Sequence, residues 1–71
     1  MLVTFAVKDN LEYIDYFERE IDDELFAAAQ NFDGPSLREV YGIGAEHLTE
    51  GETLLWAMPE SEYRQMIFFD R

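Results

Sequence analysis

The chain has 71 residues, and its 16 acidic side chains against five Lys and Arg give a formal net charge of −11. It has no cysteine, which excludes disulfide bonds and thiolate metal sites. Because 48% of the residues are hydrophobic and 15% are aromatic, the composition favours a packed core over disorder. A chain of this length predicts one compact domain over residues 1–71.

The first predicted element is a strand over residues 2–8, where β-branched and aromatic side chains alternate with smaller ones. This apolar segment lacks the basic flank and the small-residue cleavage site of a signal peptide. It is also much shorter than the ~20 apolar residues that cross a membrane. We therefore expect a cytoplasmic protein.

A long helix is predicted next, over residues 11–32. Asp9 stands three residues before Glu12, which is an acidic variant of the capping box that starts a helix. The helix should end at Asp33-Gly34-Pro35, because Gly caps a helix and Pro prevents its continuation. Apolar residues recur between these signals at steps of three or four and predict one continuous stripe. They are Leu11, Ile14, Phe17, Ile21, Leu25, Ala28 and Phe32.

A second, short helix is predicted to begin at Leu37. Ser36 and Glu39 form a capping box in front of it. Gly42 and Gly44 should then break this helix, because glycine is a poor helix former.

The last two predicted strands cover residues 53–58 and 63–69, with a turn at 59–62. A helix is the alternative for 63–69, although the adjacent aromatic residues near its end favour a strand. The predicted order is therefore β-α-α-β-β. This is an α+β fold, a two-layer sandwich of a three-stranded sheet with one long and one short helix. The order of the strands, and the choice between a monomer and a homodimer, stay open.

The acidic residues are concentrated in one part of the chain. Eight of the 16 lie between residues 9 and 24 with Arg19 as the only base, so this window carries 8 − 1 = 7 net negative charges. On the predicted helix they cover the side opposite the apolar stripe, at axial steps of about 4.5–6 Å, the same order as phosphate spacing on a nucleic-acid strand. The predicted partner-binding residues are Glu12, Asp15, Glu18, Glu20, Asp22 and Asp23, with the neighbouring Tyr13 and Tyr16.

The sequence offers little for catalysis. His47 is the only histidine, and no Ser or Cys is placed to be activated by it. The acids match neither an EF-hand nor a His–carboxylate metal site. We expect no enzyme activity, cofactor or metal. The negative charge also opposes direct contact with nucleic acid or with an anionic membrane.

In size, charge and lack of cysteine, the chain resembles the small acidic inhibitors that phages make, including anti-CRISPR proteins and other DNA mimics. This resemblance rests on bulk properties and on the acidic segment 9–24. It implies a non-catalytic inhibitor that occupies the nucleic-acid-binding site of a basic protein or complex in the host cytoplasm. Two alternatives are an antitoxin or immunity protein that neutralises a basic nuclease, and a small acidic structural domain from a halophile.

Overall fold

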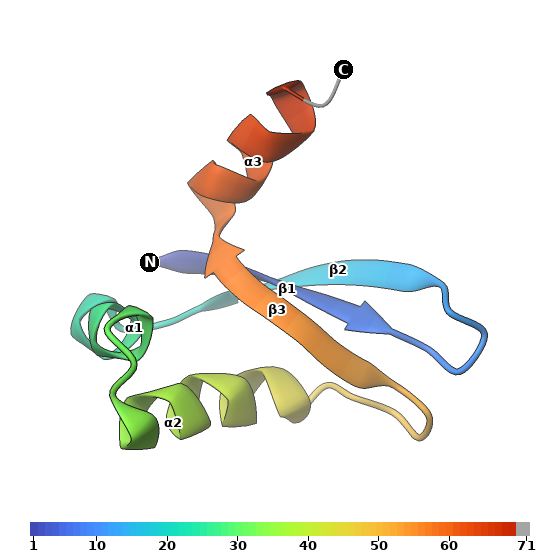
Figure 1. The fold of residues 1–71 in the computed structure, drawn as a ribbon, viewed down its shortest axis with the longest axis horizontal. Helices are drawn as coiled ribbons and strands as arrows, with labels where there is room; N and C mark the ends of the chain where they lie inside the picture. Colours follow the sequence, from blue (N-terminus) through green and yellow to red (C-terminus); the bar gives the residue numbers. More distant parts are fainter. Residues whose placement is uncertain (70–71) are drawn as a thin grey trace.

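The computed structural model describes residues 1–69. Its elements, in chain order, are β1 (Leu2–Lys8), β2 (Ile14–Glu20), α1 (Asp23–Gln30), α2 (Gly34–Ala45), β3 (Thr53–Pro59) and α3 (Glu60–Phe69). The predicted α+β class and the three-stranded sheet are confirmed, with the order β-β-α-α-β-α (Figure 1).

The sheet is antiparallel, and its strand order is β2-β1-β3. The central strand is therefore β1, as an apolar segment with neighbours on both sides should be. In the register, Phe5 lies opposite Phe17 on one side and Ala57 on the other. Ala6 pairs with Trp56 and the next residue of β1 with Leu54, so Leu55 is an extra residue that makes a β-bulge in β3.

The main core lies between one face of the sheet and the two helices α1 and α2. Val3 and Phe5 of β1 are fully buried there against Phe26 of α1 and Val40 of α2. On the opposite sheet face, Thr4 and its neighbour Ala6 are also buried. The helix α3 covers part of this second face and projects away from the end of β3 (Figure 1).

The predicted helix over residues 11–32 is wrong. Residues 14–20 form β2, which pairs with β1, and the helix α1 begins only at Asp23. Because β1 is buried on both faces, its backbone groups need strand partners at both edges, and β2 supplies one of them. Asp9 accepts hydrogen bonds from the N–H groups of Leu11 and Tyr13, both at 2.9 Å, but these bonds close a hairpin turn and do not cap a helix.

The second helix starts earlier and ends later than the sequence predicts. Asp33, not Ser36, is the N-cap of α2, and its carboxylate accepts from the Ser36 N–H and hydroxyl. The helix then continues through Gly42 and Gly44. Gly44 is needed for packing, since a Cβ there would lie 2.7 Å from the ring of Phe5.

The predicted turn at 59–62 and strand at 63–69 are also wrong, and the alternative helix is the one that forms, over Glu60–Phe69. Glu60 and Glu62 lie in its first turn, where the helix dipole favours negative charge. An ion pair between Glu60 and Arg64, one turn apart, adds local support. Residues 1–69 therefore contain three helices of 8, 12 and 10 residues, in place of one long and one short helix.

Candidate partner-binding surface

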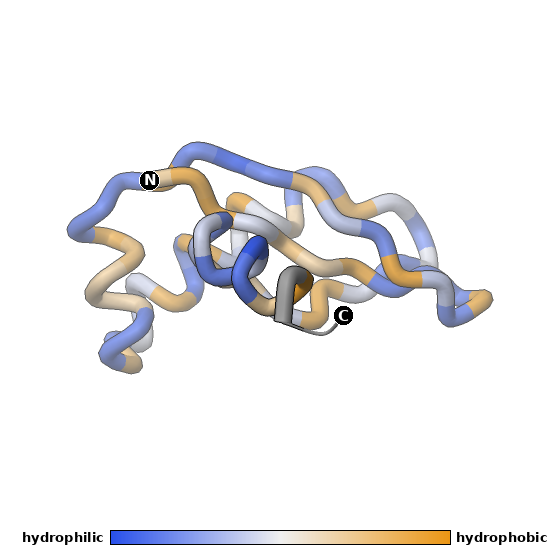
Figure 2. Tube along the Cα trace, turned by 90° about the horizontal axis from the view of Figure 1, so that it is seen from above, coloured by the Kyte–Doolittle hydropathy of each residue, from blue (hydrophilic) through white to orange (hydrophobic). Residues whose placement is uncertain are grey.

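The acidic window falls on an edge strand and on the segments that flank it. β2 pairs with β1 alone, so its outer edge is free within the described chain. Asp15, Glu18 and Glu20 on this strand are all exposed. Figure 2 shows a hydrophilic stretch in the second half of β2 and another at the start of α1. The acids therefore remain one surface feature, although the helix predicted to carry them does not form.

The strand divides these acids between two faces. Because successive side chains of a strand point to opposite sides, Asp15 projects on the side of α1 and α2, with Phe17. Glu18 and Glu20 project on the other side, with Tyr16. The prediction that all of these acids share one helix face is therefore wrong. They flank both sides of a single sheet edge.

The β1–β2 turn extends this surface. Glu12 has a φ of 69°, in the left-handed region, and is exposed. Leu11 and Tyr13 on either side of it are 72% and 69% exposed. The tip of the hairpin thus presents one carboxylate between two large apolar side chains, a combination typical of protein contact sites.

Some of the predicted binding residues already have structural partners. Asp22 is the N-cap of α1 and accepts from the Leu25 N–H at 3.1 Å. Asp23 and Glu20 lie 2.6 and 3.0 Å from the amino group of Met1. Hydrogen bonds from the Met1 amino group to Asp23 and then Glu20 raise the pKa of that group.

The other three predicted acids differ in this respect. Within residues 1–69, no ion pair involves Glu12, Asp15 or Glu18. These three carboxylates, which we call the free acidic edge, are the part of the predicted site available to a partner.

Arg19, the one base in the acidic window, is occupied elsewhere. Its guanidinium contacts both ring nitrogens of His47, at 2.5 and 2.7 Å, and donates to the Glu18 carbonyl at 2.6 Å. It also lies 5.2 Å above the ring centre of Phe17. These contacts hold the guanidinium against His47 and Phe17, and within residues 1–69 no ion pair joins it to an acid. Sequence reasoning missed them because Arg19 and His47 are 28 residues apart.

Tyr16 joins an aromatic cluster on the face opposite α1 and α2. Its ring centre is 5.9 Å from that of Trp56 and 4.9 Å from that of Tyr63. Desolvation raises the pKa of Tyr63, and the adjacent Tyr16 adds to this effect. The cluster links β2, β3 and α3, so Tyr16 is packed against two other rings while about half of it, 49%, stays exposed.

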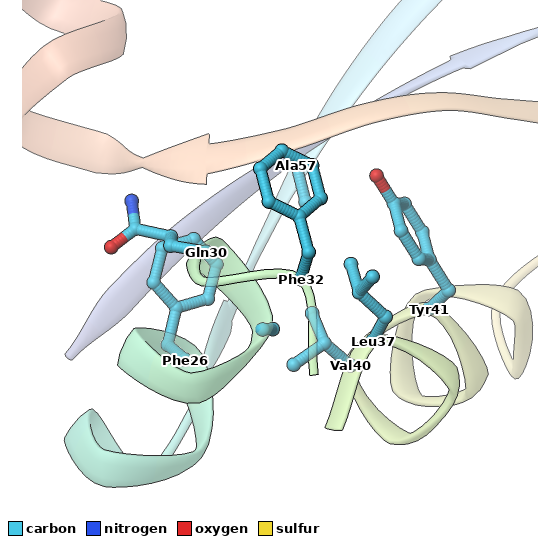
Figure 3. Close-up of a pocket in the computed structure, with 8 residues that line it drawn as sticks. Phe26, Gln30, Phe32, Leu37, Val40, Tyr41 and Ala57 are labelled. Atoms are coloured by element: carbon cyan, nitrogen blue, oxygen red, sulfur yellow. The ribbon is translucent and has the colours of Figure 1, made fainter. Parts of the chain in front are cut away.

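A hollow of about 330 Å³ lies between α1, α2 and β3 (Figure 3). It has no charged residue in its lining, which comprises Phe26, Ala29, Gln30, Phe32, Leu37, Val40, Tyr41 and Ala57. Phe32, the last residue of the predicted apolar stripe, is 85% exposed, has a φ of 63° and lies outside the helix α1. No pattern in the sequence distinguishes this exposed ring from a buried one. We call this hollow the apolar groove.

The described residues contain no group of three or more His, Cys, Asp or Glu arranged to hold a metal ion. In the same part of the chain, no helix has the length and apolar character to cross a membrane. Comparison of the chain with protein-family models, with curated proteins and with solved structures found no match.

Proposed function

We propose that the protein is a non-catalytic inhibitor that binds the nucleic-acid-binding surface of a basic protein or complex, as a phage anti-CRISPR protein does by DNA mimicry. The observation that carries the proposal is the free acidic edge. Glu12, Asp15 and Glu18 are exposed, and no ion pair within residues 1–69 involves them. Repulsion among these carboxylates destabilises the folded protein. A basic surface that binds to them relieves this repulsion, which favours the complex.

The geometry of an edge strand suits such a partner. Glu18 lies on one face two residues from Glu20, the partner of the Met1 amino group, and this step corresponds to about 6.6–6.8 Å along a strand. That distance is about twice the ~3.4 Å axial rise per nucleotide of a nucleic-acid strand. Because Asp15 projects on the other face, Lys and Arg side chains can approach the edge from both sides.

The test compares two triple variants with the same change in charge. In the first, Glu12, Asp15 and Glu18 are changed to Gln. In the matched control, three exposed acids outside the acidic window are changed to Gln; they are Glu39, Glu50 and Glu62. The partner would first be isolated at low salt, by pull-down with this protein from lysates of host cells.

We expect the first triple variant to bind that partner at least about tenfold more weakly and the control to bind within about threefold of wild type. Binding of the wild type should weaken as salt rises, and the protein should compete with DNA or RNA for the partner. Equal losses in both triples, or a partner that binds nucleic acid and this protein simultaneously, would contradict the proposal.

The alternatives predict different partners or different behaviour. An antitoxin or immunity protein would use the same acidic edge but would be recovered with a nuclease from its own genome. A halophilic structural domain would unfold at low salt, and its acids would be spread evenly over the surface. The concentration of 7 of the 11 net negative charges in residues 9–24 favours a binding role.

A further inference from the structure

The two edges of the sheet differ sharply in charge. On β2, four of seven residues are charged, namely Asp15, Glu18, Arg19 and Glu20. On β3, none of the seven residues from Thr53 to Pro59 is charged. Natural proteins commonly place charges on an exposed edge strand to prevent pairing with another sheet. The bulge at Leu55 adds local twist to β3 but leaves its edge uncharged.

We propose that β3 pairs antiparallel with β3 of a second copy of this chain, around a two-fold axis, and forms a continuous six-stranded sheet. In such an isologous contact the same strand serves on both sides, and the assembly closes at two copies. The proposal is independent of the proposed function, because it uses the edge opposite the free acidic edge.

The apolar groove supports this location for the interface. It opens next to β3, from which Ala57 contributes to its wall (Figure 3). If a strand of a second copy pairs with the free edge of β3, those of its side chains that point toward the α1 and α2 side of the sheet would lie over the apolar groove. They would then cover Phe32 and Tyr41, which are 85% and 40% exposed. Leu55 on β3 itself is 39% exposed.

The charge distribution favours a second copy as the occupant, in spite of the net charge. In the order β2-β1-β3-β3-β1-β2, the two acidic strands are the outermost ones, five steps or about 24 Å apart. That is about three times the ~8 Å screening length at physiological ionic strength. The acids at the ends of β3 already have partners, since Glu60 pairs with Arg64 and Glu52 accepts from Thr49. A basic protein is a less suitable partner for this edge than a second copy, because β3 has no acidic side chain to pair with Lys or Arg.

The first experiment measures mass by sedimentation equilibrium at about 50 mM and about 500 mM NaCl. We expect a concentration-dependent dimer that tightens with salt, because salt screens the repulsion between two acidic copies. This is the opposite of the salt dependence expected for binding to a basic partner. Failure of one proposal is therefore distinguishable from failure of the other. A mass that stays monomeric at both salt concentrations up to about 500 μM, where even weak interfaces associate, would overturn the dimer.

Two exposed leucines provide matched variants. Leu55→Lys adds a charge to the β3 edge, and Leu11→Lys makes the same change at the hairpin tip. We expect the first to weaken dimerisation at least tenfold, or about 1.4 kcal/mol, and the second to leave it unchanged. A dimer that survives Leu55→Lys, or is lost equally with Leu11→Lys, would overturn the proposal.

Phe32→Gly separates dimerisation from folding, since glycine adopts a positive φ more readily than phenylalanine does. We expect this variant to be at least as stable as wild type at low protein concentration but to dimerise more weakly. Unchanged dimerisation would remove the groove from the interface.

Because the chain lacks cysteine, single cysteines give clean distance probes. Spin labels on Leu55→Cys should lie close together in the dimer, whereas labels on Glu18→Cys should be separated by about 24 Å or more. Short distances at position 18 and long ones at 55 would show that the copies meet through β2, and would overturn the proposal.

Discussion

Two glycines in α2 have opposite effects on packing. A Cβ at Gly44 would lie 2.7 and 2.8 Å from ring carbons of Phe5 and 3.3 Å from Leu54, whereas a Cβ at Gly42 would meet nothing within 4 Å. Gly44 is therefore a position where α2 packs closely against the sheet, and Gly42 is a site where glycine only weakens the helix.

We expect Gly44→Ala to destabilise the protein by about 1–3 kcal/mol, because the Phe5 ring cannot move without disturbing the core. Gly42→Ala should stabilise it by about 0.5–1 kcal/mol, because alanine is the better helix former at an open position. Urea unfolding of the two variants, monitored by circular dichroism, measures both changes. If Gly44→Ala stabilises the protein as Gly42→Ala is expected to do, the close contact between α2 and β1 is not present in solution.

A second residue-scale prediction concerns acid. The Glu52 carboxylate accepts hydrogen bonds from the backbone N–H and the hydroxyl of Thr49, at 2.7 and 2.8 Å, and these lower its pKa below the ordinary value of 4.5. A carboxylate with a lowered pKa adds stability above its unfolded pKa and loses that contribution as the pH falls through the folded pKa. The contribution of Glu52 should therefore be complete at neutral pH and disappear below pH 4.5.

The measurement is thermal unfolding of wild type and Glu52→Gln as a function of pH. We expect the variant to be less stable at pH 7, with the difference closing in acid. Glu50→Gln is the control, because Glu50 is exposed and has no such bond to Thr49 among those described. A constant difference at all pH values would mean that the Glu52–Thr49 contact does not form.

At the scale of elements, the hairpin β1–β2 decides which apolar residues are in the core. Ile21, just after β2, is 2% exposed and belongs to the core cluster. Leu11 in the turn and Ile14 at the start of β2 are 72% and 49% exposed. The helical stripe would have buried all three on one side.

Alanine substitutions test this assignment directly. We expect Ile21→Ala to cost about 2–5 kcal/mol, which is close to the whole stability of so small a domain. Leu11→Ala should change stability by no more than about 0.5 kcal/mol, because the side chain is already in water. Comparable losses at the two positions, measured by chemical denaturation, would support the long helix and not the hairpin.

At the scale of the whole molecule, the charge of −11 opposes folding through self-repulsion. We expect the unfolding midpoint to rise as NaCl increases, because salt screens the repulsion between exposed charges, with a screening length of ~8 Å at physiological ionic strength. Changing Glu12, Asp15 and Glu18 to Gln should raise stability at low salt and flatten this salt dependence. Thermal melts at several salt concentrations give the slope. A slope unchanged by the triple variant would show that the acidic edge is not a source of the repulsion.

Local composition and pattern were enough to predict part of this fold. The alternation in residues 2–8 and 53–58 correctly predicted β1 and β3, and the balance of apolar residues and breakers correctly predicted an α+β fold with a three-stranded sheet. The concentration of acids in residues 9–24 was also readable without the structure. These properties follow from side-chain chemistry alone, because a strand with two apolar faces has to be buried wherever it lies.

The fold of the acidic segment, in contrast, depends on contacts between distant parts of the chain. Residues 11–32 satisfy the period of a helix, but the central strand β1 needs a neighbour at each edge, and pairing with residues 14–20 outweighs the local helical preference. That one choice moves Glu18 and Asp15 to opposite faces and places Phe32 in water. It also makes β3, without a charged residue, the second edge of the sheet. Strand pairing joins residues distant in the chain, and no local pattern specifies which of them meet.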